Sequence, residues 1–144
     1  KRDIESNEAL GRSRGGFSTK IHVAVDALGN PLRFILTGGQ RSDCKEVLNL
    51  MEGFSFELVL ADRGYDSHDI LAGIEKLDAK AVIPARANRT EPRETDWHLY
   101  KNRHLVECFI NKIKHYRRIF SRFEKYAKRY MAFLQFVAAL IWLK

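Results

Sequence analysis

Alternating apolar and polar residues predict two strands in the first third of the chain. The run "STKIHVAVD" places Ile21, Val23 and Val25 on one face, which is the period-two pattern of a half-buried strand. The turn-rich segment "DALGNP" separates it from a second extended run, "LRFILTGG". Because the connection is so short, we expect the two strands to pair as an antiparallel hairpin.

The next segments alternate between helical and extended patterns. "SDCKEVLNLMEGF" predicts a short helix that begins at Ser42 or Asp43 and ends near Gly53, and "SHDILAGIEKLDA" predicts a second helix capped by Ser67. Between them, "FELVLAD" is almost continuously apolar, which is typical of a strand buried on both faces. "KAVIPA" predicts a short strand that ends at Pro84.

From about Leu99 to the end, the pattern predicts a long helical C-terminus. Its apolar tail, "YMAFLQFVAALIWLK", is shorter than the roughly 20 residues that cross a bilayer, so we expect a buried helix and no membrane partner. Residues 1–16 are polar and rich in Gly and Arg, and we interpret them as a loop or linker before a single domain, 17–144. The predicted fold class is α/β, with one mixed sheet and flanking helices.

The composition is that of a folded, basic protein. Of the 144 residues, 45% are hydrophobic and 30% are charged, which excludes a disordered chain. The 25 Lys and Arg residues outnumber the 18 Asp and Glu residues and give a formal charge of +7, which favours a phosphate-bearing partner. Cys44 and Cys108 have no zinc-binding spacing, so we expect reduced cysteines and a cytoplasmic location.

Asp62 is the first candidate for chemistry. It directly follows the apolar run "ELVLA" and precedes Arg63 and Gly64. Ligand sites of open α/β sheets gather at the carboxyl ends of strands, but an Asp-Arg-Gly sequence also serves simply to end a strand. This segment alone leaves both interpretations open, and Asp66 is interpreted as part of the turn before Ser67.

A second candidate lies in the helical segment "YKNRHLVECFINKIKHYRR". At about 100° per residue, five residues fall within roughly 60° of one another, namely Tyr100, Arg103, Glu107, Lys114 and Arg118. A solvated face with an Arg103–Glu107 pair explains the mixed charges, but it does not require the excess of cations. The opposite stripe is apolar and consists of Leu105, Phe109, Ile113, Tyr116 and Phe120.

The same region is strongly basic. Nine Lys or Arg residues and two acids, Glu107 and Glu124, lie between Arg103 and Arg129, and such a stripe suits a phosphate backbone. Its cations include Lys112, Lys114, Arg117 and Arg118. Aromatic residues are interleaved with the cations, and we interpret them as core residues rather than base-stacking platforms because of their helical spacing. These are Tyr116, Phe120, Phe123, Tyr126 and Tyr130.

Asp62 and Glu107 together indicate a divalent metal site. Mg²⁺ is held by one or two carboxylates and keeps positions for substrate phosphate. Two metal ions about 4 Å apart activate a water and stabilise the leaving oxygen of a phosphodiester. Such a site usually needs more than two acids, and the pattern leaves the third one unassigned.

The chain resembles bacterial insertion-sequence transposases of the DDE class. The resemblance is carried by "GRSRGGFSTKIHVAVDALGNPLRFILTGGQRSD", "ADRGYDS", "VIPARANR" and "YKNRHLVECFINKIKHYRRIFSRFEKYAKRYMAFLQF". Its most specific part is the signature Tyr-x2-Arg-x3-Glu-x6-Lys, which Tyr100, Arg103, Glu107 and Lys114 match at each position.

The resemblance implies a ribonuclease H-like fold in which two Asp and one Glu hold two Mg²⁺ (or Mn²⁺) ions for cleavage and strand transfer of DNA. Asp62 would be the second Asp and Glu107 the glutamate, while Tyr100, Arg103 and Lys114 would lie near the DNA or support Glu107. The first Asp of the family precedes the segment that matches "GRSRGG". Asp26, the internal alternative, is interpreted as a turn residue.

These expectations imply partners and leave alternatives open. We expect the carboxy-terminal part of a catalytic domain, inactive alone, whose partners are the transposon ends and target DNA, an upstream transposase segment and a second copy on DNA. The location implied is the bacterial cytoplasm, at the nucleoid. The alternatives are a DNA-binding module or remnant without catalysis, and a related nuclease.

Overall fold

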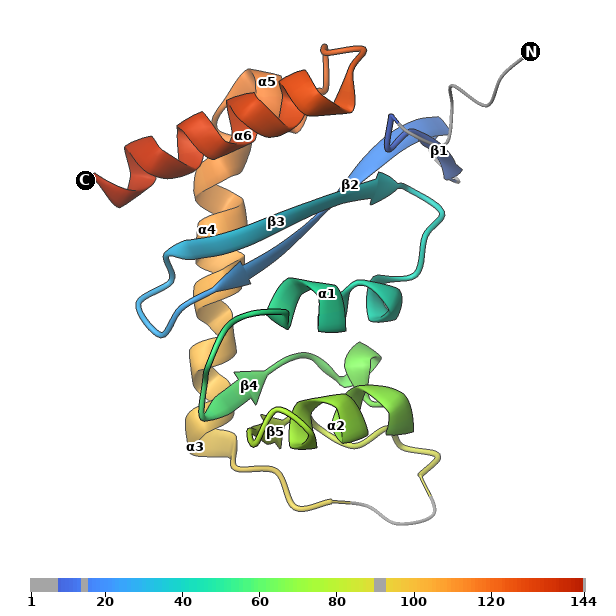
Figure 1. Cartoon of the computed structure of the whole chain (residues 1–144), viewed down its shortest axis with the longest axis vertical. Coiled ribbons are helices and arrows are strands. Elements are labelled where there is room, and N and C mark those ends of the chain that lie inside the picture. The colour runs from blue at the N-terminus through green and yellow to red at the C-terminus, as the bar shows by residue number, and fades with distance from the viewer. Residues whose placement is uncertain (1–7, 14–15, 90–92, 144) are drawn as a thin grey trace. The chain divides into compact units, whose positions relative to one another are not determined.

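The computed structural model describes residues 8–13, 16–89 and 93–143 (Figure 1). The chain divides into two compact units. We call the first, Lys1–Ser42 with Leu105–Lys144, the hairpin unit, and the second, Asp43–His104, the Asp62 unit. The α/β class is confirmed, because each unit combines strands with helices.

The sheet of the hairpin unit is antiparallel and has the order β1-β2-β3. Its strands are β1 (Gly11–Ser13), β2 (Gly16–Val25) and β3 (Pro31–Gly38). The hairpin prediction is confirmed, since β2 and β3 pair along their length. The interpretation of 1–16 as a loop is wrong for β1, whose residues hydrogen-bond to the start of β2. The remainder of that prediction on 1–7 and 14–15 lies outside the described residues.

Asp26 is the residue that forms the turn between β2 and β3. Its Oδ1 accepts hydrogen bonds from the backbone N–H groups of Leu28 (2.8 Å) and Asn30 (2.9 Å). Gly29 adopts a φ of 85°, which a residue with a Cβ rarely does. Burial opposes ionisation of Asp26, but the hydrogen bonds from Asn30 and Leu28 outweigh it and lower its pKa. Asp26 therefore stabilises a turn, as the sequence indicated.

The predicted helical C-terminus is confirmed, but two breaks divide it. The segment forms α4 (His104–Lys114), α5 (Arg117–Phe120) and α6 (Ala127–Trp142), with extended backbone at Tyr116 and Ser121. A straight helix over this length would extend about 58 Å and leave most of its apolar face without a partner. The two breaks instead bring apolar residues of all three helices into one core.

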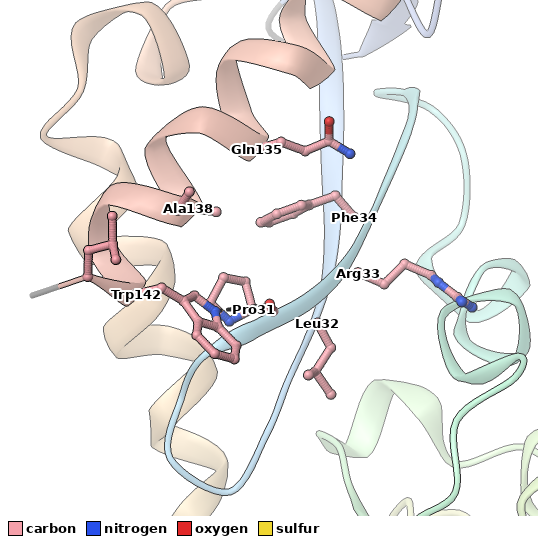
Figure 2. Close-up of a pocket in the computed structure, with 9 residues that line it drawn as sticks. Pro31, Leu32, Arg33, Phe34, Gln135, Ala138 and Trp142 are labelled. Carbon is pink, nitrogen blue, oxygen red and sulfur yellow. Dashed lines mark hydrogen bonds between the residues drawn. The ribbon is translucent and has the colours of Figure 1, made fainter.

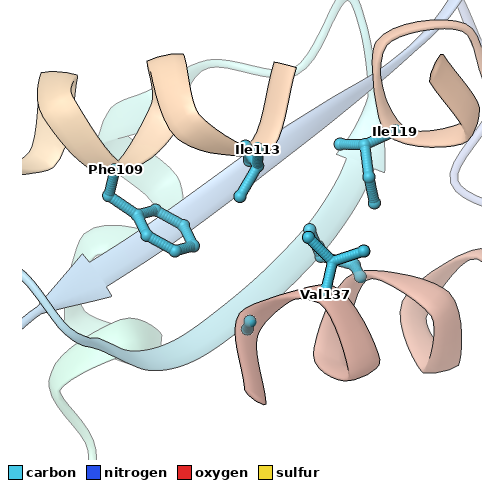
Figure 3. Close-up of a cluster of buried hydrophobic side chains, with 6 residues drawn as sticks. Phe109, Ile113, Ile119 and Val137 are labelled. Carbon is cyan, nitrogen blue, oxygen red and sulfur yellow. The ribbon is translucent and has the colours of Figure 1, made fainter. Parts of the chain in front are cut away.

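That core consists of Phe109, Ile113, Ile119, Leu134, Val137 and Ala138 (Figure 3). Apolar residues of β2 and β3 pack against it, and the rings of Phe34 and Phe109 lie 5.8 Å apart between centroids. Phe109 and Ile113 confirm the predicted apolar stripe. Phe120, which was predicted to continue it, is 71% exposed because the chain changes direction before it.

The Asp62 unit contains a parallel strand pair, β4 (Leu58–Leu60) and β5 (Lys80–Val82). Its helices are α1 (Val47–Met51), α2 (His68–Glu75) and α3 (Trp97–Tyr100), with short 3-10 turns η2 (Asp43–Lys45), η3 (Arg63–Tyr65) and η4 (Lys101–Arg103). The predicted Ser67 cap is confirmed, since its hydroxyl accepts from the Ile70 N–H at 3.3 Å. The helix predicted to begin at Ser42 or Asp43 starts as the 3-10 turn η2 at Asp43, and α1 itself begins after Glu46.

Met51, Ile70, Ile74 and Ile83 form a separate core in this unit. The strand β4 was predicted to be buried on both faces, but Leu58 is 37% exposed and its neighbours are half-buried. Among the described residues, the strands also form two sheets instead of one mixed sheet. β4 is only partly buried because it pairs with a strand on one edge and takes its apolar contacts from the core that α1 and α2 supply.

In the described ranges, no helix combines the length and apolar character needed to cross a membrane.

Truncating the fully buried Leu134 tests the core of the hairpin unit. We expect Leu134→Ala to lower the free energy of unfolding by about 2–5 kcal/mol, because it removes buried methyl groups and leaves a cavity. Leu143→Ala, at a position 85% exposed, should change it by less than about 0.5 kcal/mol. Urea unfolding followed by Trp142 fluorescence in a Trp97→Phe background measures both, and equal losses would contradict the assignment.

Candidate active site at the end of β4

Asp62 follows β4 by two residues and caps the turn η3. Its backbone is extended, and its Oδ1 accepts a hydrogen bond from the Gly64 N–H at 2.7 Å. The side chain is exposed. A carboxylate has two oxygens with about four acceptor positions, so this bond leaves capacity for a cation. Asp62 therefore ends the strand and also presents a carboxylate to the outside.

An open pocket lies beside Asp62. It is lined by Asp62, Arg63, Gly64, Pro84, Trp97 and Tyr100. The rings of Trp97 and Tyr100 meet edge to face, with centroids 5.6 Å apart. The Arg103 guanidinium lies 5.6 Å from the Tyr100 ring centroid. The Asp62 unit thus brings together three of the predicted site residues, Asp62, Tyr100 and Arg103.

The short helix that carries Tyr100 has a defined start. Asp96 caps α3 by accepting from the Leu99 N–H at 3.0 Å, and η4 follows α3 directly. Trp97 is 58% exposed, although an apolar side chain of this size usually packs inside. Because Trp97 lines the same pocket as Asp62, it is a candidate site residue. The sequence pattern did not indicate it.

Asp66 is a buried structural residue, and its interpretation as a simple turn residue was incomplete. Its side chain is fully buried and forms ion pairs with Arg89 (2.9 Å) and Arg93 (2.8 Å). It also accepts from the Arg86 N–H at 2.7 Å. The Arg86 guanidinium in turn donates to the Gly64 carbonyl at 2.6 Å. These contacts fasten the segment after β5 to the loop that follows Asp62.

The electrostatics of this loop follow from those contacts. Burial opposes ionisation of Asp66, but hydrogen bonds from Arg86, Arg89 and Arg93 outweigh it and lower its pKa to about 2. Burial raises the pKa of Tyr65 to about 12, with a further contribution from the nearby charges of Asp43 and Asp62. At neutral pH the loop therefore holds a charged Asp66 and a neutral Tyr65.

Glu107 lies in the first turn of α4, and its side chain is exposed. Lys114 follows it by seven residues on the same helix, which is close to two full turns. The other predicted DNA contacts of the hairpin unit, Lys112, Arg117 and Arg118, are exposed near the end of α4 and in α5. Asp62 and Glu107 belong to different units, so a shared metal site stays a prediction.

The interleaved aromatic residues depart from the core interpretation. Tyr130 is buried and Tyr116 is half-buried, as the helical spacing indicated. Phe120, Phe123 and Tyr126 are 71%, 61% and 46% exposed. Phe120 leaves the helical stripe because the chain changes direction at Tyr116, and Phe123 and Tyr126 leave it because they lie in the break between α5 and α6.

The described residues alone do not form a complete metal site. No group of three or more His, Cys, Asp or Glu side chains there is arranged to hold a metal ion. Asp62 fits an oxygen ligand for Mg²⁺ by its exposure and its remaining acceptor capacity. Another pocket lies between Pro31–Phe34 of β3 and Trp142 of α6 (Figure 2), but no acidic residue lines it.

The comparisons with known proteins identify the class. Residues 5–142 match the family described as Transposase DDE domain, and the chain belongs to this family. Two relatives are each named "Putative transposase", for insertion sequence element IS6501 of Brucella ovis and IS402 of Burkholderia cepacia. No solved structure matches the chain.

The relatives differ in length. The Brucella protein is 42% identical over 129 residues, which are 88% of this chain and 99% of the relative. The Burkholderia protein is 34% identical over 142 residues, which are 90% of this chain and 64% of the relative. The chain is thus an insertion-sequence transposase of the DDE class, and it spans about two thirds of the Burkholderia relative.

Replacing Asp66 tests the loop. Asp66→Asn should lower the free energy of unfolding at pH 7 by about 1.5–3 kcal/mol, as expected for lost hydrogen bonds to a charged group. Because the folded-state pKa of Asp66 is about 2 against an ordinary 3.8, its contribution is complete above about pH 4 and is lost as the pH falls towards 2.

The difference between wild type and Asp66→Asn should therefore narrow below pH 4. Urea unfolding at pH 7, 4 and 3, followed by Trp97 fluorescence in a Trp142→Phe background, measures it. Glu75→Gln, at an exposed acid on α2, is the matched control and should show little change at pH 7. A difference that stays constant from pH 7 to pH 3 and below would contradict the role of the ionised Asp66.

Proposed function

We propose that this chain contributes Asp62 and Glu107 to a metal-dependent site that cleaves insertion-sequence ends and joins them to target DNA. The observation that carries the proposal is the exposed Asp62 carboxylate at the end of a parallel strand, in one pocket with Tyr100. Sites of open α/β sheets form at these strand ends. Family membership supplies the reaction class.

Two Mg²⁺ or Mn²⁺ ions supply the electrostatic part of this chemistry when bound, because they activate a water or hydroxyl and stabilise the leaving oxygen. In the proposal, Asp62 and Glu107 each give carboxylate oxygens to these ions. The Gly64 N–H binds one Asp62 oxygen, which leaves the other available as the proposed metal ligand. Tyr100 shares the pocket of Asp62, and Arg103, which lies against the Tyr100 ring, is the proposed cationic contact for a phosphate of the bound strand.

The upstream segment is the proposed source of the third acid. In a ribonuclease H-like arrangement, a strand ending in Asp would pair along the edge of β4 opposite β5. Leu58 and its neighbours on β4 are apolar yet partly exposed, which is an unfavourable state for an edge strand. Covering this edge would bury them and would bring another strand end next to Asp62. Without that strand, we propose that the chain alone does not cleave DNA.

The basic residues of the hairpin unit are proposed to bind the DNA backbone. Lys112, Lys114, Arg117 and Arg118 are exposed on or near α4 and α5, and cations release counterions when they contact phosphates. Double-stranded element ends and target DNA are the proposed ligands, bound by two copies of the protein at the bacterial nucleoid.

A DNA-binding function without catalysis is the second candidate. It is favoured by the exposed basic residues of the hairpin unit, which do not depend on Asp62. It requires salt-sensitive DNA binding that persists when Asp62 is replaced. Undetectable affinity for DNA at low salt would exclude it.

Conservative replacement of the two acids tests the proposal in the full-length protein with its upstream segment. Asp62→Asn and Glu107→Gln should each reduce Mg²⁺-dependent nicking of element-end DNA by more than about 100-fold, because several kcal/mol of metal stabilisation are lost. Affinity for the same DNA in EDTA should change by less than about threefold.

Asp69→Asn, at an exposed acid in the first turn of α2, is the control and should nick normally. If Asp62→Asn or Glu107→Gln nicks as fast as wild type, the metal assignment is wrong. If all variants bind DNA and the wild type does not nick it with Mg²⁺ or Mn²⁺, the second candidate function is favoured.

A further inference from the structure

Three large aromatic side chains are exposed together in the segment Phe120–Tyr126, which we call the aromatic segment. It begins at the last residue of α5 and leads to α6 (Figure 1). Phe120 and Phe123 are more than 60% exposed and Tyr126 is 46% exposed. Burying side chains of this kind stabilises a protein, so three exposed ones within seven residues are a candidate binding surface.

Arg122 holds the aromatic segment in a fixed conformation. Its guanidinium donates to the backbone carbonyls of Glu124 (2.9 Å) and Lys125 (3.1 Å), and also to that of Glu8 (2.8 Å). It bonds to the Thr19 hydroxyl on β2 as well. These bonds join Arg122 to the two residues that follow Phe123, to Glu8 and to β2, so the backbone that carries the exposed ring is held in place.

Tyr130 completes this support from α6. Its ring is 2% exposed and lies 5.3 Å from the Arg122 guanidinium carbon. Its hydroxyl donates to the Ile119 carbonyl at 2.7 Å, which joins the start of α6 to α5. The exposed rings are therefore joined to a partly buried polar network.

Cations stand beside the exposed rings. The guanidinium carbon of Arg117 lies 5.8 Å from the Phe123 ring centroid, and that of Arg129 lies 5.2 Å from the Tyr126 centroid. The Lys125 ammonium is 5.9 Å from the Tyr126 centroid on the same segment. The stretch from 117 to 130 carries six Lys or Arg residues and one acid, Glu124. Aromatic faces and positive charge thus occur at a single site.

We infer that the aromatic segment binds unpaired bases of DNA, with Phe120, Phe123 and Tyr126 as stacking surfaces and the neighbouring cations on the phosphates. Single-stranded DNA is recognised by this combination, since every base has a face that stacks on an aromatic ring. Paired bases inside a duplex do not offer that face. A second copy of the chain is disfavoured as the occupant, because the like charges of two such segments repel.

This inference rests on the proposed function for the choice of DNA, and it adds a preference for strands whose bases are unpaired. Strand cleavage and transfer produce such bases wherever a duplex end opens. The aromatic segment lies outside the Asp62 unit. It can therefore be tested by substitutions that leave the residues of the Asp62 pocket unchanged.

The test compares binding of a 12-nucleotide oligothymidylate and a matched duplex to the full chain by fluorescence anisotropy at low salt. Phe123→Ala and Tyr126→Ala should each weaken binding of the single strand by about 5- to 100-fold, as is typical for loss of one stacked base. Affinity for the duplex should change by less than about threefold. Phe136→Ala, at an aromatic residue 59% exposed on α6, is the matched control and should behave as wild type.

Several results would overturn the inference. One is unchanged single-strand affinity in both variants, and another is an equal loss for single strand and duplex. A third is a change of oligomeric state in sedimentation without a change in single-strand affinity, which would assign the segment to contacts between copies. The variant Asp62→Asn distinguishes this inference from the cleavage proposal. It should bind the single strand normally, whereas the cleavage proposal is tested by nicking alone.

Discussion

The loop that follows β4 depends on one buried carboxylate, that of Asp66. This carboxylate accepts hydrogen bonds from the side chains of Arg89 and Arg93 and from the backbone N–H of Arg86, all in the segment after β5. A buried charge without such partners is strongly unfavourable. The folded conformation of the loop therefore depends on these contacts. Arg86 and Cys44 then fasten the Gly64 carbonyl from two other segments. The position of Asp62 depends on these contacts, because its side chain accepts a hydrogen bond from the Gly64 N–H.

A similar principle operates in the hairpin unit. There a partly buried guanidinium, that of Arg122, ties a segment without regular structure to β2 and α6. In both units, residues that lack helix or strand pairing are therefore positioned by a charged group that accepts or donates several hydrogen bonds. The two supported segments carry the exposed acid at the pocket and the exposed aromatic rings. The proposals assign cleavage to the loop after β4 and the binding of unpaired bases to the aromatic segment.

Local patterns in the sequence predicted the hairpin, the Asp26 turn, the Ser67 cap and the apolar stripe at Phe109 and Ile113. These features depend on neighbouring residues, so periodicity and turn chemistry suffice for them. The breaks after α4 and α5 were missed because the residues there have ordinary helical propensity, and tertiary packing decides their conformation. Asp66, Trp97 and Arg122 were missed as well, since their roles come from partners up to 114 positions away. The position of Asp62 after a strand was predicted because strand ends follow from local patterns, whereas its pocket with Tyr100 was not predicted.

The most direct test of the central claim is a change of metal preference at Asp62. In the full-length protein, Asp62→Cys replaces an oxygen ligand by a softer thiolate, which Mg²⁺ binds poorly and Mn²⁺ accepts better. Nicking of element-end DNA should be lost in Mg²⁺ and recovered in Mn²⁺, while wild type is active in both. Full activity of Asp62→Cys in Mg²⁺, or no recovery in Mn²⁺ by a variant that binds DNA normally, would contradict direct contact between Asp62 and the metal.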